Sequence, residues 1–137
     1  MIEKHQVMNL LIKACPSFEK SWKQYIAETY EDGEEQLPYI DMIYFIQHLI
    51  ELYKQNNTEE FRDIFEVVEL MHSDGSDYVK EVATIGFFET LQNQLSNNNI
   101  DIDEFKSYLI PLSNTWWNHL LDFWNGKMEY VGGPLKE

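Results

Sequence analysis

The histidines and the acidic residues near them are the side chains whose types and spacing could do chemistry. The sequence has four histidines. Three of them stand three residues from a carboxylate, in the pairs Glu69 and His72, His48 and Glu51, and His119 and Asp122. On a helix this spacing places both side chains on one face, as in carboxylate-bridged dimetal sites. Such a site also needs inward carboxylates from other helices, and the apolar faces of this chain supply none. We therefore predict no metal ligands and no cofactor.

The individual histidines fit this interpretation. His48 and His119 fall among polar residues, and Glu69 belongs to the outward, acidic side of its helix. His72 shares a side with apolar residues near the end of the same helix, so we expect a partly buried imidazole whose positive form the helix dipole favours.

The single cysteine, Cys15, is followed directly by Pro16 and has no nucleophile signature around it. A buried thiol is the expectation, and one cysteine excludes an internal disulfide and fits a reducing compartment. The chain also contains no P-loop, GxGxxG, HExxH or GxSxG motif. We therefore predict no catalytic residues, with a cryptic metal-dependent enzyme left open as an alternative.

The elements that must position these residues are helices. Apolar residues recur at helical spacing throughout, and no stretch alternates as a strand would. The expected helices cover residues 3–14, 16–29, 37–55, 58–72, 76–95, 101–110 and 113–124, with Thr58 and Ser113 as N-caps. The prediction is an all-α fold of six or seven helices, arranged as antiparallel hairpins in a right-handed superhelical, HEAT-like orthogonal bundle.

Two stretches should be the most deeply packed. Residues 76–95 carry apolar side chains on all sides, which is typical of a buried helix, and Gly86 indicates that another helix crosses closely there. Phe88 falls in the most polar sector of this stretch. In residues 37–55 one polar arc, which begins with Asp41, opposes a broad apolar face.

The length and the termini predict one domain. We expect a single helical domain over residues 1–125 and a flexible C-terminal tail over residues 126–137. No apolar run approaches the roughly 20 residues that span a bilayer, so we expect a soluble, cytoplasmic protein.

The charge is strongly acidic and unevenly placed. The formal net charge is −14, and residues 28–77 carry fourteen acidic side chains against only Lys54 and Arg62. Such a field repels nucleic acid and anionic membranes and favours a basic protein partner. A solvated surface that only keeps the protein soluble would account for the same charge.

Candidate partner-binding residues follow from this charge and from the aromatic residues. One set is the acidic side of the fourth helix: Glu59, Glu60, Asp63 and Glu66. The other set could anchor a partner if exposed: Phe88, Trp116, Trp117 and Trp124. For the last helix, core packing of its aromatic stripe is the preferred interpretation.

Two resemblances point the same way. The residues Asp77, Val79, Lys80 and Ala83 resemble the opening of the inner helix of HEAT repeats, although Gly86 comes early for that pattern. The run from LPYIDMI to GFFETLQN, followed by the WW…FW helix, is similar to small acidic bacterial proteins with an uncharacterised all-helical domain. Families of that kind include immunity-type proteins, which neutralise a toxin. This resemblance implies a non-enzymatic binding protein; a homodimeric helical scaffold is a further alternative.

Overall fold

The structure, a computed structural model, describes residues 1–35 and 37–124, and the predicted all-α class is confirmed. The α-helices are α1 (Val7–Ala14), α2 (Glu19–Thr29), α3 (Pro38–Lys54), α4 (Phe61–Asp74), α5 (Asp77–Glu81), α6 (Thr90–Asn97) and α7 (Pro111–Trp124). Three short 3-10 helices, η1 (Lys4–Gln6), η2 (Pro16–Phe18) and η4 (Ile102–Tyr108), join them, and a π-helix, η3 (Val82–Glu89), links α5 to α6.

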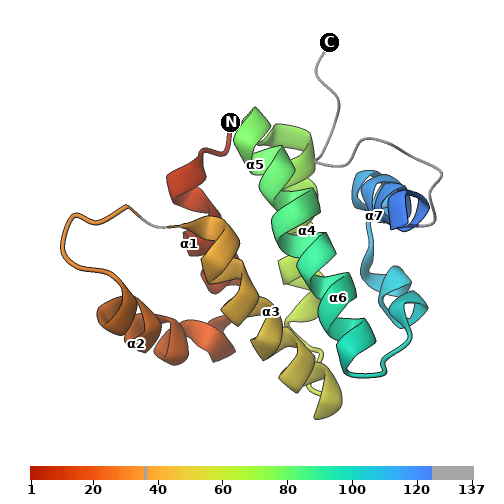
Figure 1. The fold of residues 1–137 in the computed structure, drawn as a ribbon, viewed down its shortest axis with the longest axis horizontal. Helices are drawn as coiled ribbons and strands as arrows, with labels where there is room; N and C mark the ends of the chain where they lie inside the picture. The colour runs from red at the N-terminus through yellow and green to blue at the C-terminus, as the bar shows by residue number, and fades with distance from the viewer. Residues whose placement is uncertain (36, 125–137) are drawn as a thin grey trace.

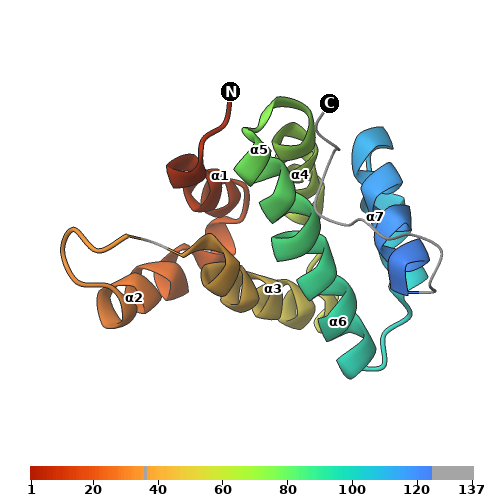
Figure 2. The ribbon, with the colours of Figure 1, turned by 45° about the horizontal axis from the view of Figure 1, so that its top comes forward.

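The centre of the fold is the continuous rod formed by α5, η3 and α6 (Figure 1). This rod lies between α3 on one side and α7 on the other, and α4 packs against it as well (Figures 1 and 2). The rings of Phe45 in α3 and Phe65 in α4 both pack on Phe87 of η3, with centroids 6.4 and 5.7 Å away. The rod is therefore enclosed by apolar contacts, as its all-round apolar sequence predicted.

Gly86 marks the predicted close crossing. A Cβ built on Gly86 would stand 3.4 Å from Cδ1 of Tyr39 in α3 and 3.2 Å from Cγ1 of Val82. The missing side chain therefore lets α3 approach the rod closely at this point.

The π-helix was not predicted, and neither was the burial of Phe88 within it. Phe88 was expected in a polar sector, but it is fully buried, and the edge of its ring contacts Trp117 of α7 at 5.3 Å between centroids. Gln92, one turn further on, is also buried and donates to the carbonyl of Trp117 at 3.4 Å. The prediction that Phe88 is exposed is wrong because α7 covers this side of the rod.

Asp41 also differs from expectation. It was assigned to the polar arc of α3, yet it is fully buried, because the end of α2 and the chain after it fold over the first turn of α3. The hydroxyls of Tyr25 and Tyr30 both donate to its Oδ1, at 2.7 and 2.6 Å. Burial, together with these hydrogen bonds to the carboxylate, raises the pKa of both tyrosines. Asp41 therefore joins α2 to α3.

Replacing Asp41 by Ala is expected to lower the free energy of unfolding by about 2 kcal/mol, because two partly buried hydroxyls lose a charged acceptor. Oδ2 of Asp41 is buried without a hydrogen-bond partner among the described residues, which costs free energy in the wild type. The alanine variant no longer has this cost, so the net loss should not be larger. Urea denaturation measures the change. Asp63→Ala, at an exposed position of α4, is the control and should stay within about 0.5 kcal/mol of the wild type. Equal losses in both variants would contradict this role of Asp41.

Two predicted caps are wrong. α4 begins at Phe61 after Glu60, so Thr58 is not its N-cap, although the Thr58 carbonyl accepts from the amide of Phe61 at 3.1 Å. α7 begins at Pro111, which places Ser113 inside the helix and in the core. The predicted flexible tail, residues 126–137, lies outside the described residues, and the domain boundary at 125 stays a prediction.

Candidate functional site

His72 stands in the core instead of at a metal site. The side chain is 1% exposed, its Nε2 is 3.0 Å from Oγ1 of Thr84, and its Nδ1 is 3.3 Å from Oγ of Ser113. Burial lowers the pKa of His72 to about 4. The prediction that its positive form is favoured is therefore wrong: loss of hydration outweighs the helix dipole, and the neutral ring holds α4, η3 and α7 together.

The three predicted histidine and carboxylate pairs do not gather around a common point. Glu69 accepts from the backbone amide of Ser113 at 2.7 Å, and the His119 ring contacts Trp116 with centroids 4.5 Å apart. His48 lies beside Ser17, as described next. Within residues 1–35 and 37–124, no three His, Cys, Asp or Glu side chains are arranged to hold a metal ion.

A polar cluster joins η2, α3 and the start of α4. Oγ of Ser17 donates to Oε2 of Glu60 at 2.5 Å and lies 2.8 Å from Nε2 of His48. The backbone amide of Ser17 donates to Oε1 of Glu60 at 2.9 Å. Cys15 is fully buried next to it, and burial raises the pKa of its thiol to about 11, so the thiol is protonated at neutral pH.

This cluster does not have the arrangement of a nucleophilic triad. In a triad the carboxylate orients the histidine, which then takes the proton of the serine. Here the carboxylate of Glu60 bonds the hydroxyl and the amide of Ser17 directly, so that it caps the start of η2. A neighbouring cavity of about 390 Å³ is lined by Ser17, Leu52, Asn57, Glu59 and Glu60. The geometry supports a structural role for Glu60, and its part in partner binding stays a prediction.

The other predicted acidic residues are on the surface. Glu59, Asp63 and Glu66 are exposed, and Glu66 forms an ion pair with Arg62 at 3.4 Å. Lys54, the remaining cation of residues 28–77, pairs with Glu51 at 3.8 Å. Both cations of this stretch are thus engaged within their own helices.

The predicted aromatic anchors are mostly in the core. Trp117 is fully buried and Trp116 is 6% exposed, which agrees with the preferred interpretation of the stripe as core packing. Neither these two residues nor Phe88 meets the condition of exposure that anchoring requires. The side chain of Trp124 lies outside the part of the chain that the structure describes.

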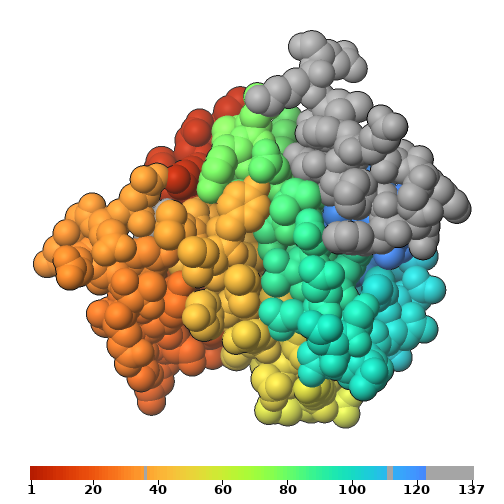
Figure 3. Space-filling model, viewed as in Figure 1, coloured from red at the N-terminus to blue at the C-terminus, as the bar shows by residue number. Residues whose placement is uncertain are grey.

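Sequence reasoning missed an exposed apolar strip on the outer side of α3. It consists of Leu37, Ile40, Ile43 and Tyr44, of which Ile40 is 46% and Ile43 41% exposed. This surface of α3, amber in Figure 3, is open between α2 and the rod. Further along the helix the same face carries the polar residues Gln47 and Glu51. These polar residues indicate in the sequence that the apolar strip is exposed.

Carboxylates flank the apolar strip on both sides. On the rod, Glu81 accepts from the hydroxyl of Tyr39 at 2.7 Å. The pKa of Tyr39 is raised, chiefly by burial and by Glu81, and the charge of Glu89 adds to this effect. Burial also raises the pKa of Glu89, which has no hydrogen bond or ion pair with the described residues. On the other side, before α3, stands the exposed acidic loop of residues 31–35.

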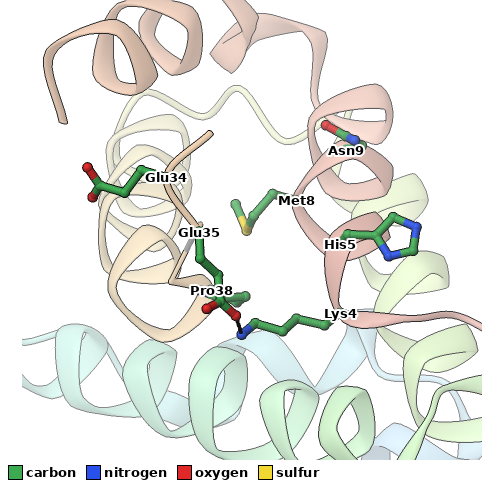
Figure 4. A pocket seen from close by; sticks show the side chains of 7 residues that line it. All are labelled: Lys4, His5, Met8, Asn9, Glu34, Glu35 and Pro38. Atoms are coloured by element: carbon green, nitrogen blue, oxygen red, sulfur yellow. Dashed lines mark hydrogen bonds and ion pairs between the residues drawn. The ribbon is translucent and has the colours of Figure 1, made fainter. Parts of the chain in front are cut away.

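The loop also borders a cavity of about 460 Å³ between η1, α1 and α3. Lys4 and Glu35 reach toward one another across it and form an ion pair, and Met8 lies between them and Asn9 (Figure 4). Lys4 and Glu35 neutralise one another, so the carboxylate of Glu34 and the imidazole of His5 are the remaining ionisable groups that line the cavity.

The fold and these surfaces define an all-α protein with an acidic, partly apolar exterior. None of the described helices is long and apolar enough to cross a membrane. Residues 8–125 match the family described as a domain of unknown function, DUF7674, so the chain belongs to that family. Neither a curated protein nor a solved structure matches the chain.

Proposed function

We propose that this protein is a non-enzymatic binding module, which presents the acidic surface of residues 28–77 to a basic protein partner. The observation that carries the proposal is the excess of exposed carboxylates on this surface. Its two cations are already paired within their own helices, while Glu59 and Asp63 face solvent and form no ion pair with the residues that the structure describes. Such an uncompensated field steers a basic partner toward the surface and accelerates association.

A finer form of the proposal is that the partner is a basic toxin, which the chain would neutralise as an immunity-type protein. This form rests on the resemblance of the acidic helical stretch to such families. The HEAT-like opening of α5 belongs to the proposal in the same way, since stacked helical hairpins commonly present binding surfaces. No specific observation favours the alternatives, a cryptic metal-dependent enzyme or a homodimeric scaffold.

Affinity capture tests the proposal. The purified wild type is used as bait in a native cell lysate at low salt, beside a Glu59→Gln/Asp63→Asn double variant. We expect the wild type to retain a basic protein that elutes as ionic strength rises, and the double variant to retain several-fold less. Glu60 is left unchanged, because its removal would free the start of η2.

A matched control removes the same charge elsewhere. Glu19→Gln/Asp103→Asn changes two exposed acids outside residues 28–77 and should capture as much partner as the wild type. Capture that does not respond to salt, or that both double variants reduce equally, would contradict the proposal.

A further inference from the structure

We propose that the outer face of α3, between the acidic loop and the rod, is the docking surface for a basic amphipathic helix of the partner, with Glu89 as the acceptor for one of its cations. The docking face consists of Leu37, Ile40, Ile43 and Tyr44. This inference rests on the proposed function and names the surface and the kind of ligand.

The shape of the docking face suits a helix. Leu37, Ile40 and Tyr44 follow one another at intervals of three and four residues, and the face extends about 10 Å along the helix axis. A partner helix with apolar residues at i, i+3, i+4 and i+7 offers a complementary stripe of similar length. The rings of Tyr25 and Tyr44, 4.6 Å apart, and the hydrogen bond from Gln94 to the carbonyl of Ile43 hold α2 and α6 beside this face. The face is therefore framed by fixed elements.

The charges beside the docking face specify a basic helix. Glu89 is partly buried, its pKa is raised by that burial, and no described residue pairs with it. A lysine or arginine of the partner would neutralise this desolvated carboxylate. The attraction between the two charges becomes stronger as docking excludes water. On the opposite edge Glu31, Asp32 and Glu34 are exposed and can receive further cations, whereas Glu35 already pairs with Lys4.

The same charges disfavour the other occupants of an apolar surface. A second copy of this chain would bring its own acids against those of the first, with a net charge of −14 on each molecule. An anionic membrane would be repelled in the same way. A basic helix is the occupant for which apolar contact and charge agree.

The test uses a fluorescent peptide of about 14 residues, with leucines at i, i+3, i+4 and i+7 and lysines at the remaining positions. We expect salt-dependent binding to the wild type. Ile40→Ser/Ile43→Ser should bind about tenfold more weakly, because the apolar area available to the leucines is reduced. Leu70→Ser, at a 51% exposed apolar position on α4, is the matched control and should bind as the wild type does.

Glu89→Gln isolates the charge. This variant should bind the peptide about threefold more weakly and with a smaller dependence on salt, whereas Asp103→Asn should change neither. Circular dichroism confirms that each variant is folded. A scrambled peptide of the same composition should bind less than the amphipathic one. Equal binding of the two peptides, or unchanged binding by the α3 variant, would overturn the inference.

The proposed function can survive that failure. If a lysate partner is lost with Glu59→Gln/Asp63→Asn but kept with Ile40→Ser/Ile43→Ser, the protein binds a basic partner through another surface. If the wild type instead forms dimers in analytical ultracentrifugation that Ile40→Ser/Ile43→Ser abolishes, the docking face belongs to a second copy, and the inference is overturned.

Discussion

Gly75→Ala is expected to lower the free energy of unfolding by about 3 kcal/mol, the largest effect expected of an added methyl group at any of the described glycines. The Cβ would stand 2.3 Å from the carbonyl oxygen of Met71 and 2.6 Å from Cγ1 of Val79, and a backbone atom cannot move away cheaply. The same turn also holds the N-terminus: the amide of Ser76 donates to the carbonyl of Ile2 at 2.9 Å. A shift at Gly75 would therefore disturb both the α4–α5 connection and residues 1–3.

Denaturation in urea measures this change, with Gly86→Ala as the control. At Gly86 the nearest atom is Cγ1 of Val82 at 3.2 Å, a side chain that can move, and alanine favours the helix over glycine. The two effects nearly cancel, so Gly86→Ala should stay within about 1 kcal/mol of the wild type. If Gly75→Ala were as stable as the wild type, the α4–α5 turn would not be packed as described.

Acid is expected to remove about 3 kcal/mol of stability through His72 alone, as the pH falls from about 6.5 to about 4. The folded protein keeps this imidazole neutral because it is buried between Thr84 and Ser113. The unfolded chain takes up the proton first, near pH 6.5, so that protonation favours unfolding. The stabilising contribution of the neutral His72 is fully present above pH 6.5 and is lost as the pH falls from about 6.5 to about 4.

Urea denaturation at a series of pH values measures this dependence. His72→Asn is expected to be less stable at pH 7, where it loses packing, but to show a flatter profile between pH 6.5 and 4. His5→Asn, at an exposed position, should keep the wild-type profile. The acidic residues contribute equally in all three proteins, so parallel profiles for the wild type and His72→Asn would contradict the buried, neutral state of His72.

Most of the fold could be predicted from local patterns. The periodicity of residues 58–72 places the buried side chains of α4 correctly, because its apolar residues form one stripe that faces the core. The predicted helix of residues 76–95 begins where α5 begins, and Ser76 is its N-cap, which accepts from the amide of Val79 at 3.3 Å. Such features depend on neighbours within one or two turns.

The differences come from contacts between distant segments. α7 covers the sector of the rod that holds Phe88 and Gln92, and nothing in residues 76–95 alone indicates that cover. Asp41 looks like a surface carboxylate until the tyrosines of the α2 segment reach it. In each case the segment that covers the residue lies elsewhere in the sequence. The apolar pattern of one helix therefore cannot predict that the residue is buried.

The candidate binding surface was predictable only in its charge. Counting acids in residues 28–77 located the acidic surface, but it could not separate Glu60, which bonds Ser17, from the exposed Glu59. The apolar residues of the docking face were not singled out, because the broad apolar face of residues 37–55 was expected to be packed. These residues stay exposed because α2 and α6 contact α3 at the edges of this face, through Tyr25 with Tyr44 and through Gln94 with Ile43.

The measurement that tests the central claim most directly is a methyl NMR titration of isoleucine-labelled wild type with the amphipathic basic peptide. We expect the methyl signals of Ile40 and Ile43 to shift, while those of the buried Ile46 and Ile64 stay in place. Shifts confined to isoleucines away from α3, or no shift at peptide excess, would contradict the assignment of this face as the binding surface.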